Sequence, residues 1–363
     1  MVEGPFSVKV EPDWEAFRSC IMMEGTPERV HYIELFLDGE VKDEICERYG
    51  VTDHLDPGEE FYNLKREVAI QRFLGYDYVR QGVGNLNMPL NRSNIEDTAD
   101  LKREGGRAYM EEHAGPITSW EDYENYPWPD PHETTTTALE WYEENLPEDM
   151  CIIGSGGFGH FAEYLTWLMG YESLCYSLYD QRDLVRAISD RLLDMYRIIL
   201  GKILQFDRVK IVWGSDDMGY KTGTLISPDD TREFMLPGHK IMAQMSHEAG
   251  RPYILHSCGN LEAIIDDLIE DVQIDGKHSF EDVFETVIEA EEKYGDRIAL
   301  LGGIDVDLLC RASEEEVRGK VCETLEACMP GGGFCLGTGN SVANYIPLDN
   351  YLAMLDEGRK WSP

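Results

Sequence analysis

Short apolar runs alternate along the chain with longer segments whose apolar positions recur at helical spacing. The apolar runs predict strands, and eight of them fall at about 30–36, 76–80, 150–153, 210–213, 253–255, 272–274, 298–301 and around 335. Helices are predicted between them, the main ones at about 40–49, 60–73, 161–178, 181–205, 228–250, 261–269, 283–294, 313–329 and 348–359. This alternation predicts an α/β fold, a (β/α)8 TIM barrel, with a doubly wound sheet as the alternative.

One long stretch interrupts the alternation. Residues 82–131 carry many glycines, prolines and aromatic residues but no regular period. Such a stretch inside a compact domain indicates either a hairpin insertion that covers a site or a surface arm. We therefore expect a single domain, 1–363, with an insertion or cap at 82–131.

His256 and Cys258 follow a short apolar run and, at the strand period of two, point to the same side. Imidazole nitrogen and thiolate sulfur together suit Zn2+, but two ligands do not hold the ion. Cys335, in a second short strand 77 positions further on, is the best candidate for the third ligand. Three protein ligands with one open position are typical of a catalytic zinc site. The alternative is that both cysteines are ordinary buried thiols and that His256 is a core histidine.

In a barrel the chemistry lies at the C-terminal ends of the strands. The polar and aromatic residues that follow the predicted strands would therefore meet at one mouth. Besides the zinc candidates they include Phe158, His160, Trp213, Asp216, Asp217, His278, Glu281, Asp305 and Asn340.

Composition narrows the class of protein. Seventy acidic residues against 32 basic ones give a net charge of −38, which argues against nucleic acid or an anionic membrane as a partner. The sequence has no long apolar run and no signal-peptide pattern, so we expect a cytoplasmic protein. Nine cysteines without a pairing pattern indicate reduced thiols. The sequence also allows a homodimer.

Gly154, Gly156 and Gly159 follow a predicted strand and open a helix, as in a dinucleotide-binding turn. About 20 residues later, however, the helix continues where a second strand with an acidic residue belongs. A tight turn at the barrel mouth explains these glycines better than a nucleotide cofactor.

Several motifs that together cover most of the chain point to a known family: Pro-Glu-Arg-Val at 27–30, Trp-Glu-Asp-Tyr at 120–123, and the segments 214–219, 254–260, 301–305 and 330–334. With these motifs the chain resembles the uroporphyrinogen decarboxylase superfamily, and in particular its zinc-dependent, corrinoid-linked methyltransferase branch. The resemblance implies a (β/α)8 barrel with the active site in its mouth. It also implies that His256, Cys258 and Cys335 bind zinc, since that branch carries a His-x-Cys followed by a distant Cys. The arginine-rich N-terminal segment of the true decarboxylases has no counterpart here.

The resemblance implies an enzyme of the methyltransferase class that works with Zn2+ and a corrinoid (cobalamin) carried by a separate protein. Zinc bound by two thiolates and one neutral imidazole carries no net charge, so it leaves a bound thiolate nucleophilic or weakly polarises an ether oxygen. His160, Asp217, His278 and Glu281 are candidates for the acid that protonates a leaving oxygen. His278 and Glu281 are also candidates for a fourth zinc ligand.

Aromatic residues around the predicted mouth favour a flat, methoxylated ring as the methyl donor, and hence an O-demethylase. Candidate substrate contacts are Phe158, Trp213, Tyr220 and Asn340, with further rings at Phe280, Phe334, Trp120 and Trp128. The rival interpretation is that these rings belong to the core. A thiol acceptor of the coenzyme M type, a cofactor-free decarboxylase of the family type and a non-catalytic barrel subunit are the alternative functions.

Overall fold

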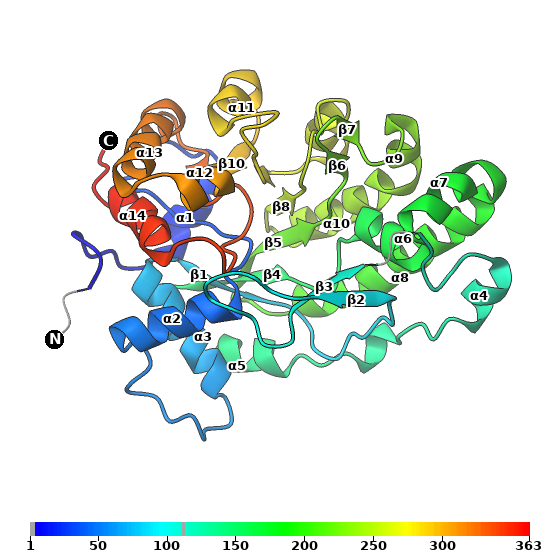
Figure 1. Ribbon diagram of the computed structural model, residues 1–363, viewed down its shortest axis with the longest axis horizontal. Coiled ribbons are helices and arrows are strands. Elements are labelled where there is room, and N and C mark those ends of the chain that lie inside the picture. Colours follow the sequence, from blue (N-terminus) through cyan, green and yellow to red (C-terminus); the bar gives the residue numbers. More distant parts are fainter. Residues whose placement is uncertain (1–3, 111–112) are drawn as a thin grey trace.

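A computed structural model describes residues 4–110 and 113–363. At its centre lies a parallel seven-stranded sheet in the order β1-β4-β5-β8-β9-β10-β11, curved into most of a barrel and surrounded by helices (Figure 1). Its strands are β1 (Tyr78–Gln81), β4 (Cys151–Ser155), β5 (Val209–Ser215), β8 (Tyr253–His256), β9 (Gly276–His278), β10 (Ala299–Leu301) and β11 (Phe334–Cys335). The TIM-barrel-like α/β fold predicted from the alternation is confirmed.

The first predicted strand takes part in the barrel in an unusual way. Residues 30–37 lie beside the chain after β11, joined to it by the parallel bridges Tyr32–Leu336 and Leu37–Val342. No backbone bridge joins residues 30–37 to β1 within the described part of the chain; side-chain contacts such as Tyr78 Oη with the backbone of Glu34 span the gap instead. We call this gap between residues 30–37 and β1 the seam.

Most helices pack around the outside of the barrel. They are α1 (Trp14–Ile21), α2 (Gly39–Tyr49), α3 (Tyr62–Leu74), α5 (Thr137–Asn145), α6 (Phe161–Met169), α7 (Tyr171–Asp180), α8 (Arg182–Ile203), α9 (Pro228–Phe234), α10 (Leu236–Glu248), α11 (Val287–Tyr294), α12 (Val306–Arg311), α13 (Glu314–Cys328) and α14 (Leu348–Gly358). Capping boxes begin two of them, Thr286 with Glu289 at α11 and Ser313 with Glu316 at α13. Each box satisfies backbone donors at both its residues, which explains why these helices begin where they do.

Helix α1 lies against the N-terminal ends of the strands. Asp13 N donates to the Asp77 carboxylate just before β1, and Trp14 N donates to the carbonyl of Asp149 just before β4. Gly333 N, just before β11, donates to the carbonyl of Cys20. Helix α1 thus covers the end of the barrel opposite to the strand C-termini.

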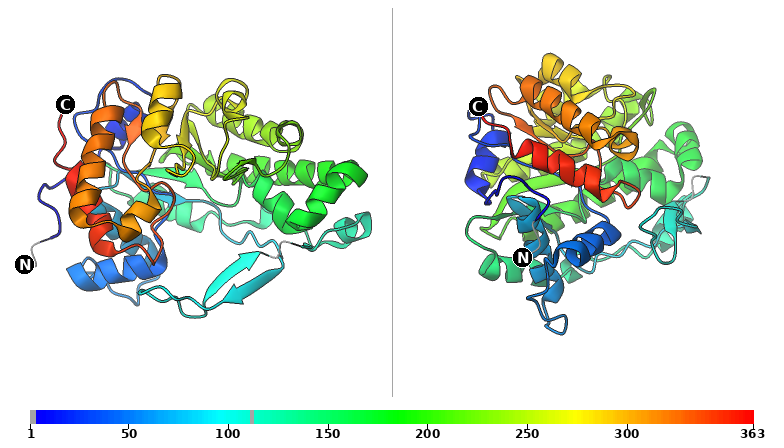
Figure 2. Two further views of the ribbon diagram at one scale, coloured as in Figure 1. Left: turned by 45° about the horizontal axis from the view of Figure 1, so that its top comes forward. Right: turned by 60° about the vertical axis from the view of Figure 1, so that its left-hand side comes forward.

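The segment predicted to be an insertion contains a hairpin. Strands β2 (Arg92–Ile95) and β3 (Arg107–Met110) pair antiparallel and lie apart from the central sheet (Figure 2). The short helix α4 (Trp120–Asn125) and a 3-10 turn, Pro131–Glu133, follow. A second small hairpin, β6 (Gly219–Tyr220) with β7 (Gly223–Thr224), stands after β5.

Two predicted elements between β8 and α11 were wrong. The segment expected to be a helix at 261–269 forms a π-helical turn at Asp267–Val272, and the strand expected at 272–274 is β9, Gly276–His278. Strand β9 contains the polar residues Lys277 and His278, so a search for apolar runs does not detect it. Helix α11 also begins later than predicted.

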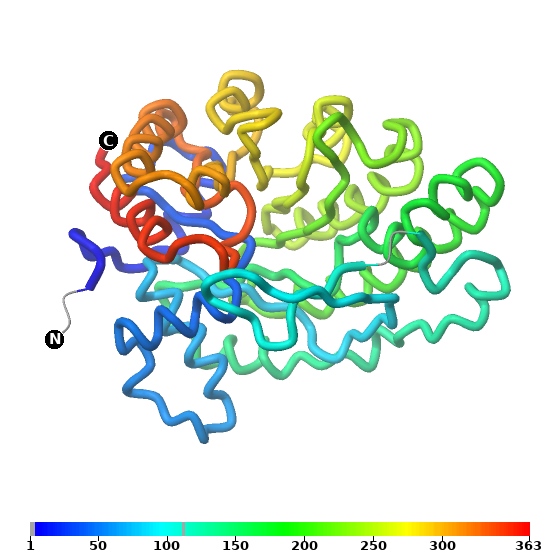
Figure 3. The backbone as a smooth tube through the Cα atoms, in the orientation of Figure 1, coloured from blue at the N-terminus to red at the C-terminus, as the bar shows by residue number. Residues whose placement is uncertain are grey.

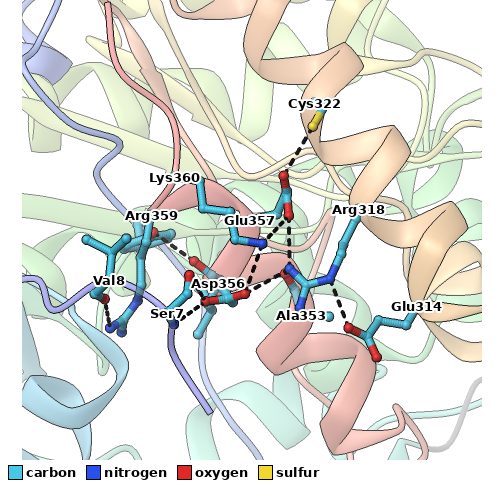
Figure 4. A network of polar contacts seen from close by, with 12 residues as sticks. Ser7, Val8, Glu314, Arg318, Cys322, Ala353, Asp356, Glu357, Arg359 and Lys360 are labelled. Carbon is cyan, nitrogen blue, oxygen red and sulfur yellow. Dashed lines mark hydrogen bonds and ion pairs between the residues drawn. The ribbon is translucent and has the colours of Figure 1, made fainter. Parts of the chain in front are cut away.

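The N-terminal segment and α14 lie on the same side of the molecule (Figure 3). Ser7 donates twice to the Asp356 carboxylate, and Arg318 of α13 pairs with both Asp356 and Glu357 (Figure 4). Burial raises the pKa of Asp356, but its hydrogen bonds from Ser7 and Arg318 outweigh this and lower the pKa to about 2. This network ties the first residues to the last helices. No helix in the described residues is long and apolar enough to cross a membrane.

A candidate metal centre at the barrel mouth

Three potential metal ligands meet where β5 and β8 end. Asp217 Oδ1, His256 Nε2 and Cys258 Sγ all lie within 4.8 Å of one another. His256 Nε2 is 3.3 Å from Asp217 Oδ1 and 3.3 Å from Cys258 Sγ. The backbone N–H of Cys258 donates to Asp217 Oδ1 over 2.9 Å, so the two loops hold each other.

Glycines allow these loops to approach. Gly259 has a φ of +83°, which favours glycine, and a Cβ there would come within 2.1 Å of the Gly219 backbone. Gly219 N in turn donates to the carbonyl of Cys258. A larger residue at either position would separate Asp217 from Cys258.

The charges in this cluster favour a bound cation. Burial raises the pKa of Asp217, but its contacts with His256 and the Cys258 N–H outweigh burial and hold the pKa well below its ordinary value. Burial and the neighbouring Asp217 carboxylate raise the pKa of Cys258 well above its ordinary value. A metal ion reverses this second effect, because coordination deprotonates a thiol. The cluster therefore offers one fixed carboxylate and one thiol that ionises when a cation binds.

His278 is placed to orient His256. Its Nδ1 lies 2.7 Å from His256 Nδ1, and burial followed by the charge of His256 lowers its pKa well below the usual value. If His256 uses Nε2 as a ligand, its Nδ1 carries the proton and donates it to neutral His278. That leaves the proton of His278 on Nε2, which is buried and has no hydrogen-bond partner among the residues that the structure describes. Such a hydrogen bond fixes the ring and tautomer of a metal-binding histidine.

Two residues near Cys258 were missed by the sequence analysis. Ser279 has a φ of +91°, rare for a residue with a side chain, and its hydroxyl lies 3.7 Å from Cys258 Sγ. Lys277 donates to the Ser279 carbonyl over 2.5 Å. Burial lowers the pKa of Lys277 to about 8. No pattern in a three-residue polar strand could have identified this support.

Asn340, predicted to contact substrate, lies in the cluster, with Nδ2 3.1 Å from Cys258 Sγ. Cys335, predicted to be the third zinc ligand, does not. It is fully buried, shares a hydrogen bond with Cys20 of α1, and has its pKa raised by burial and by that thiol. The set His256, Cys258 and Cys335 is therefore not brought together, and Asp217 takes the third position.

The shear of the barrel explains this correction. Cys335 shares one hydrogen-bonded row with His256, through His278 and Leu301. In an eight-stranded barrel with a shear of eight, positions of equal height advance by about one residue per strand. Strand β11 is three strands beyond β8, so the residue at the height of Cys258 lies about three positions beyond the row of Cys258, at residue 340. Cys335 lies below that height, towards α1.

The remaining candidate acids have different surroundings. His160 Nδ1 lies 2.6 Å from Glu163 Oε2; burial lowers the pKa of His160, but the glutamate outweighs it and raises the pKa overall. Burial raises the pKa of Glu281, with the charge of Asp305 adding to it. Asp216 serves the scaffold, since its carboxylate accepts the N–H groups of Ala162 and Glu163 at the start of α6 and contacts His239.

Most of the predicted aromatic lining belongs to the core. Phe158, Trp213, Phe280 and Phe334 are buried, and Trp213 packs edge-on against His278. Tyr220 is 61% exposed and lines a cavity of about 670 Å3 between the hairpins and α6–α7. Other rings of that cavity are Tyr109, Trp167 and Tyr171.

The donor atoms present fit zinc. In a tetrahedral site with metal–ligand distances of about 2.0–2.3 Å, ligand atoms lie roughly 3.3–3.8 Å apart. The two separations around His256 Nε2, both 3.3 Å, agree with that spacing. Nitrogen, sulfur and carboxylate oxygen are all accepted by zinc, and three such ligands leave one position open.

The comparisons with known proteins identify the family. Residues 104–361 match the family model described as uroporphyrinogen decarboxylase (URO-D). The chain belongs to the uroporphyrinogen decarboxylase family. Over 268 residues it is 26% identical to a uroporphyrinogen decarboxylase from Alkalilimnicola ehrlichii, with 68% of each chain covered.

Methyltransferases are also among the similar proteins. The chain is 32% identical over 133 residues to a methylated-thiol–coenzyme M methyltransferase from Methanosarcina mazei, covering 36% of this chain and 33% of that protein. A solved structure of a methyltransferase from Methanosarcina mazei superimposes with a TM-score of 0.66 and 17% identity, covering 95% of this chain and 97% of the other. The structural likeness supports the shared fold.

Proposed function

We propose that this URO-D family member is a zinc-dependent methyltransferase that moves a methyl group between a small substrate and the cobalt of a separate corrinoid protein. The observation that carries the proposal is the convergence of His256, Cys258 and Asp217 on one point at the barrel mouth. The similarity to a methanogen methyltransferase supports the same class of reaction.

These residues would hold zinc with a thiolate, a carboxylate and a neutral imidazole, leaving no net charge on the site. When bound, such an ion activates a substrate thiol or polarises an ether oxygen without withdrawing much electron density. His278 keeps the His256 proton on Nδ1, and Ser279 and Asn340 surround the Cys258 sulfur. The chain thus supplies both the ligands and the groups that orient them.

His160 is the proposed acid for a leaving oxygen. Its pairing with Glu163 raises the pKa of His160 above the usual value, and the ring stacks on Trp167, which lines the aromatic cavity. That cavity favours an aryl methyl ether as the methyl donor, with Tyr220 only three positions beyond Asp217. A thiol acceptor of the coenzyme M type is the second candidate, favoured by the similarity to the thiol methyltransferase.

Metal analysis of the purified protein tests the proposal first. We expect close to one zinc per chain, lost in His256→Ala and in Cys258→Ala. A folded protein that binds no zinc would contradict the proposal and favour a decarboxylase or a non-catalytic subunit.

A second assay identifies the substrate. The protein is incubated with a reduced corrinoid protein and either methoxyarenes or methanol, and with a methylated corrinoid protein and thiols. Methylation of the corrinoid by methoxyarenes would support the aryl ether. Turnover with thiols alone would replace it with the second candidate.

A further inference from the structure

The seam between residues 30–37 and β1 contains a cavity of about 330 Å3 that is separate from the aromatic cavity. Its walls combine apolar side chains, among them Leu35, Leu37 and Leu64 with the ring of Tyr142, with polar and charged ones. Arg80 of β1 also lines it. A cavity at the lower end of the usual range for ligand sites suits a small molecule.

Arg80 has no carboxylate partner among the described residues, and unlike Arg208 and Arg359 it has no backbone carbonyl at its terminal nitrogens either. Its Nε donates to Ser155 Oγ over 3.2 Å, and its guanidinium lies 4.4 Å from the centre of the Trp213 ring. Within residues 4–110 and 113–363 it forms no ion pair, and its two terminal nitrogens have no hydrogen-bond acceptor. Burial lowers its pKa to about 10, so Arg80 is still charged at neutral pH.

The other charged groups of the cavity do not compensate Arg80. Lys42 and Glu67 pair with each other at 2.7 Å. Glu34 turns its carboxyl group to the N–H and hydroxyl of Thr338, and burial raises its pKa to about 8, so it is mainly neutral at pH 7. The cavity therefore keeps one positive charge in a protein whose net charge is −38.

The charge of Arg80 is energetically unfavourable in a partly desolvated place without a counter-charge. The chain contains 70 acidic residues, yet none of those described pairs with it. We propose that the seam cavity binds a small organic anion whose carboxylate or sulfonate is held by the terminal nitrogens of Arg80. The planar guanidinium fits such a group with two parallel hydrogen bonds, while Trp213 packs on its face. The leucines and Tyr142 would contact the body of the ligand, which favours an organic anion over inorganic phosphate.

A series of side-chain contacts links Arg80 to the metal cluster. Arg80 stacks on Trp213, Trp213 packs on His278, and His278 hydrogen-bonds His256. The proposal nevertheless requires neither zinc nor methyl transfer. Binding in this cavity can therefore be measured whatever reaction the mouth performs.

Calorimetric titration of the full-length protein with benzoate and with propanesulfonate tests the proposal. Benzamide and inorganic phosphate serve as probes that lack the charge or the apolar body. We expect one of the two organic anions to bind, benzamide and phosphate to bind far more weakly, and Arg80→Met to weaken anion binding by about 100-fold. Arg66→Met is the matched control, because Arg66 of α3 pairs with Asp43 on the surface, and it should bind like wild type.

Thermal unfolding gives a second readout. Without ligand, Arg80→Met should melt at the same temperature as wild type or higher, because it removes an unpaired charge; the organic anion should raise the melting temperature of wild type but not of Arg80→Met. If Arg80→Met does not fold, Arg80→Lys replaces it, with an expected loss of about tenfold because the paired geometry is gone. Equal binding of benzamide, undiminished binding by the folded Arg80 variant, or no binding of either organic anion to wild type would overturn the proposal.

Discussion

Cys258 follows strand β8 and Cys335 ends strand β11 of the same sheet, yet the two thiols lie in opposite environments. Cys258 stands at the mouth beside His256, Asp217 and Asn340, so its sulfur has nitrogen and oxygen donors around it. Cys335 lies towards α1, where its sulfur meets a second buried thiol, Cys20. Burial raises the pKa of both thiols, so burial alone does not separate them.

The convergence of other ligand atoms distinguishes the two sites. A thiol in the core acts as a small apolar group, whereas a thiol that shares a point with an imidazole and a carboxylate can bind a cation. This comparison predicts opposite consequences for the same substitution in the two places.

The largest contrast is expected from Cys258→Ser and Cys335→Ser. Cys258→Ser replaces a thiolate with a hydroxyl that stays protonated near neutral pH, so we expect loss of zinc and a fall in methyl transfer of about a thousandfold or more, with the melting temperature within a few degrees of wild type. Cys335→Ser should keep its zinc but unfold at a lower temperature, because it places a hydroxyl in the core.

Metal content, activity and thermal unfolding of both variants are measured side by side. Cys335→Ala is the control for the hydroxyl, since it removes the sulfur without adding a polar group. Zinc loss in both Cys335 variants, with normal folding, would show that Cys335 is a ligand after all.

Asp217→Asn tests the third ligand with a smaller change. The amide keeps an oxygen that can accept the Cys258 N–H but removes the negative charge, so we expect zinc affinity to fall by up to about 100-fold. Competition with a chromogenic chelator measures the affinity. The matched control is Asp305→Asn, since the Asp305 carboxylate accepts backbone N–H groups at the start of α12 and lies outside the ligand cluster. Equal affinity of Asp217→Asn and wild type would remove Asp217 from the ligand set.

His278→Phe tests the orientation of His256. It removes the acceptor for the His256 Nδ1 proton while filling a similar volume, and we expect zinc to bind about tenfold more weakly. A role limited to packing would change the melting temperature but leave both zinc affinity and its pH dependence as in wild type. His278→Gln, whose side-chain oxygen can accept the same proton, should restore part of the affinity.

The smallest expected effect concerns Glu34, whose partner Thr338 is level with His256. The folded-state pKa of about 8 lies above the usual value of Glu, so the contribution of Glu34 to stability is complete below about pH 4.5 and is lost as the pH rises to about 8. The free energy of unfolding should fall over that window by no more than about 1.4 kcal/mol per pH unit on this account. In Glu34→Gln this part of the slope should vanish in urea titrations at pH 5, 6.5 and 8; an unchanged slope would mean that Glu34 is ionised when folded.

The periodic parts of the sequence predicted the barrel well, because most of its strands are short apolar runs that alternate with helices. They also predicted that His256 and Cys258 would share a face at a strand end, since two residues in one strand need only the strand period. The position of Cys335 needed the shear between strands, which arises from closing the sheet and has no sequence signal. The rings of Phe158 and Trp213 were misjudged for a related reason, since a strand end in the chain does not say how deep its side chain lies.

The bridges between Tyr32 and Leu336 and between Leu37 and Val342 also determine when the barrel can close during synthesis of the chain. The first strand must wait for a partner that is made about 300 residues later, which at about 5–20 residues per second takes on the order of 15–60 s. During that time its apolar residues Val30, Tyr32 and Ile33 have no final neighbours across the sheet. Contacts between residues so distant in sequence form slowly in general. The last step in making this protein is therefore the closing of its barrel, and the incomplete chain is the form most exposed to aggregation.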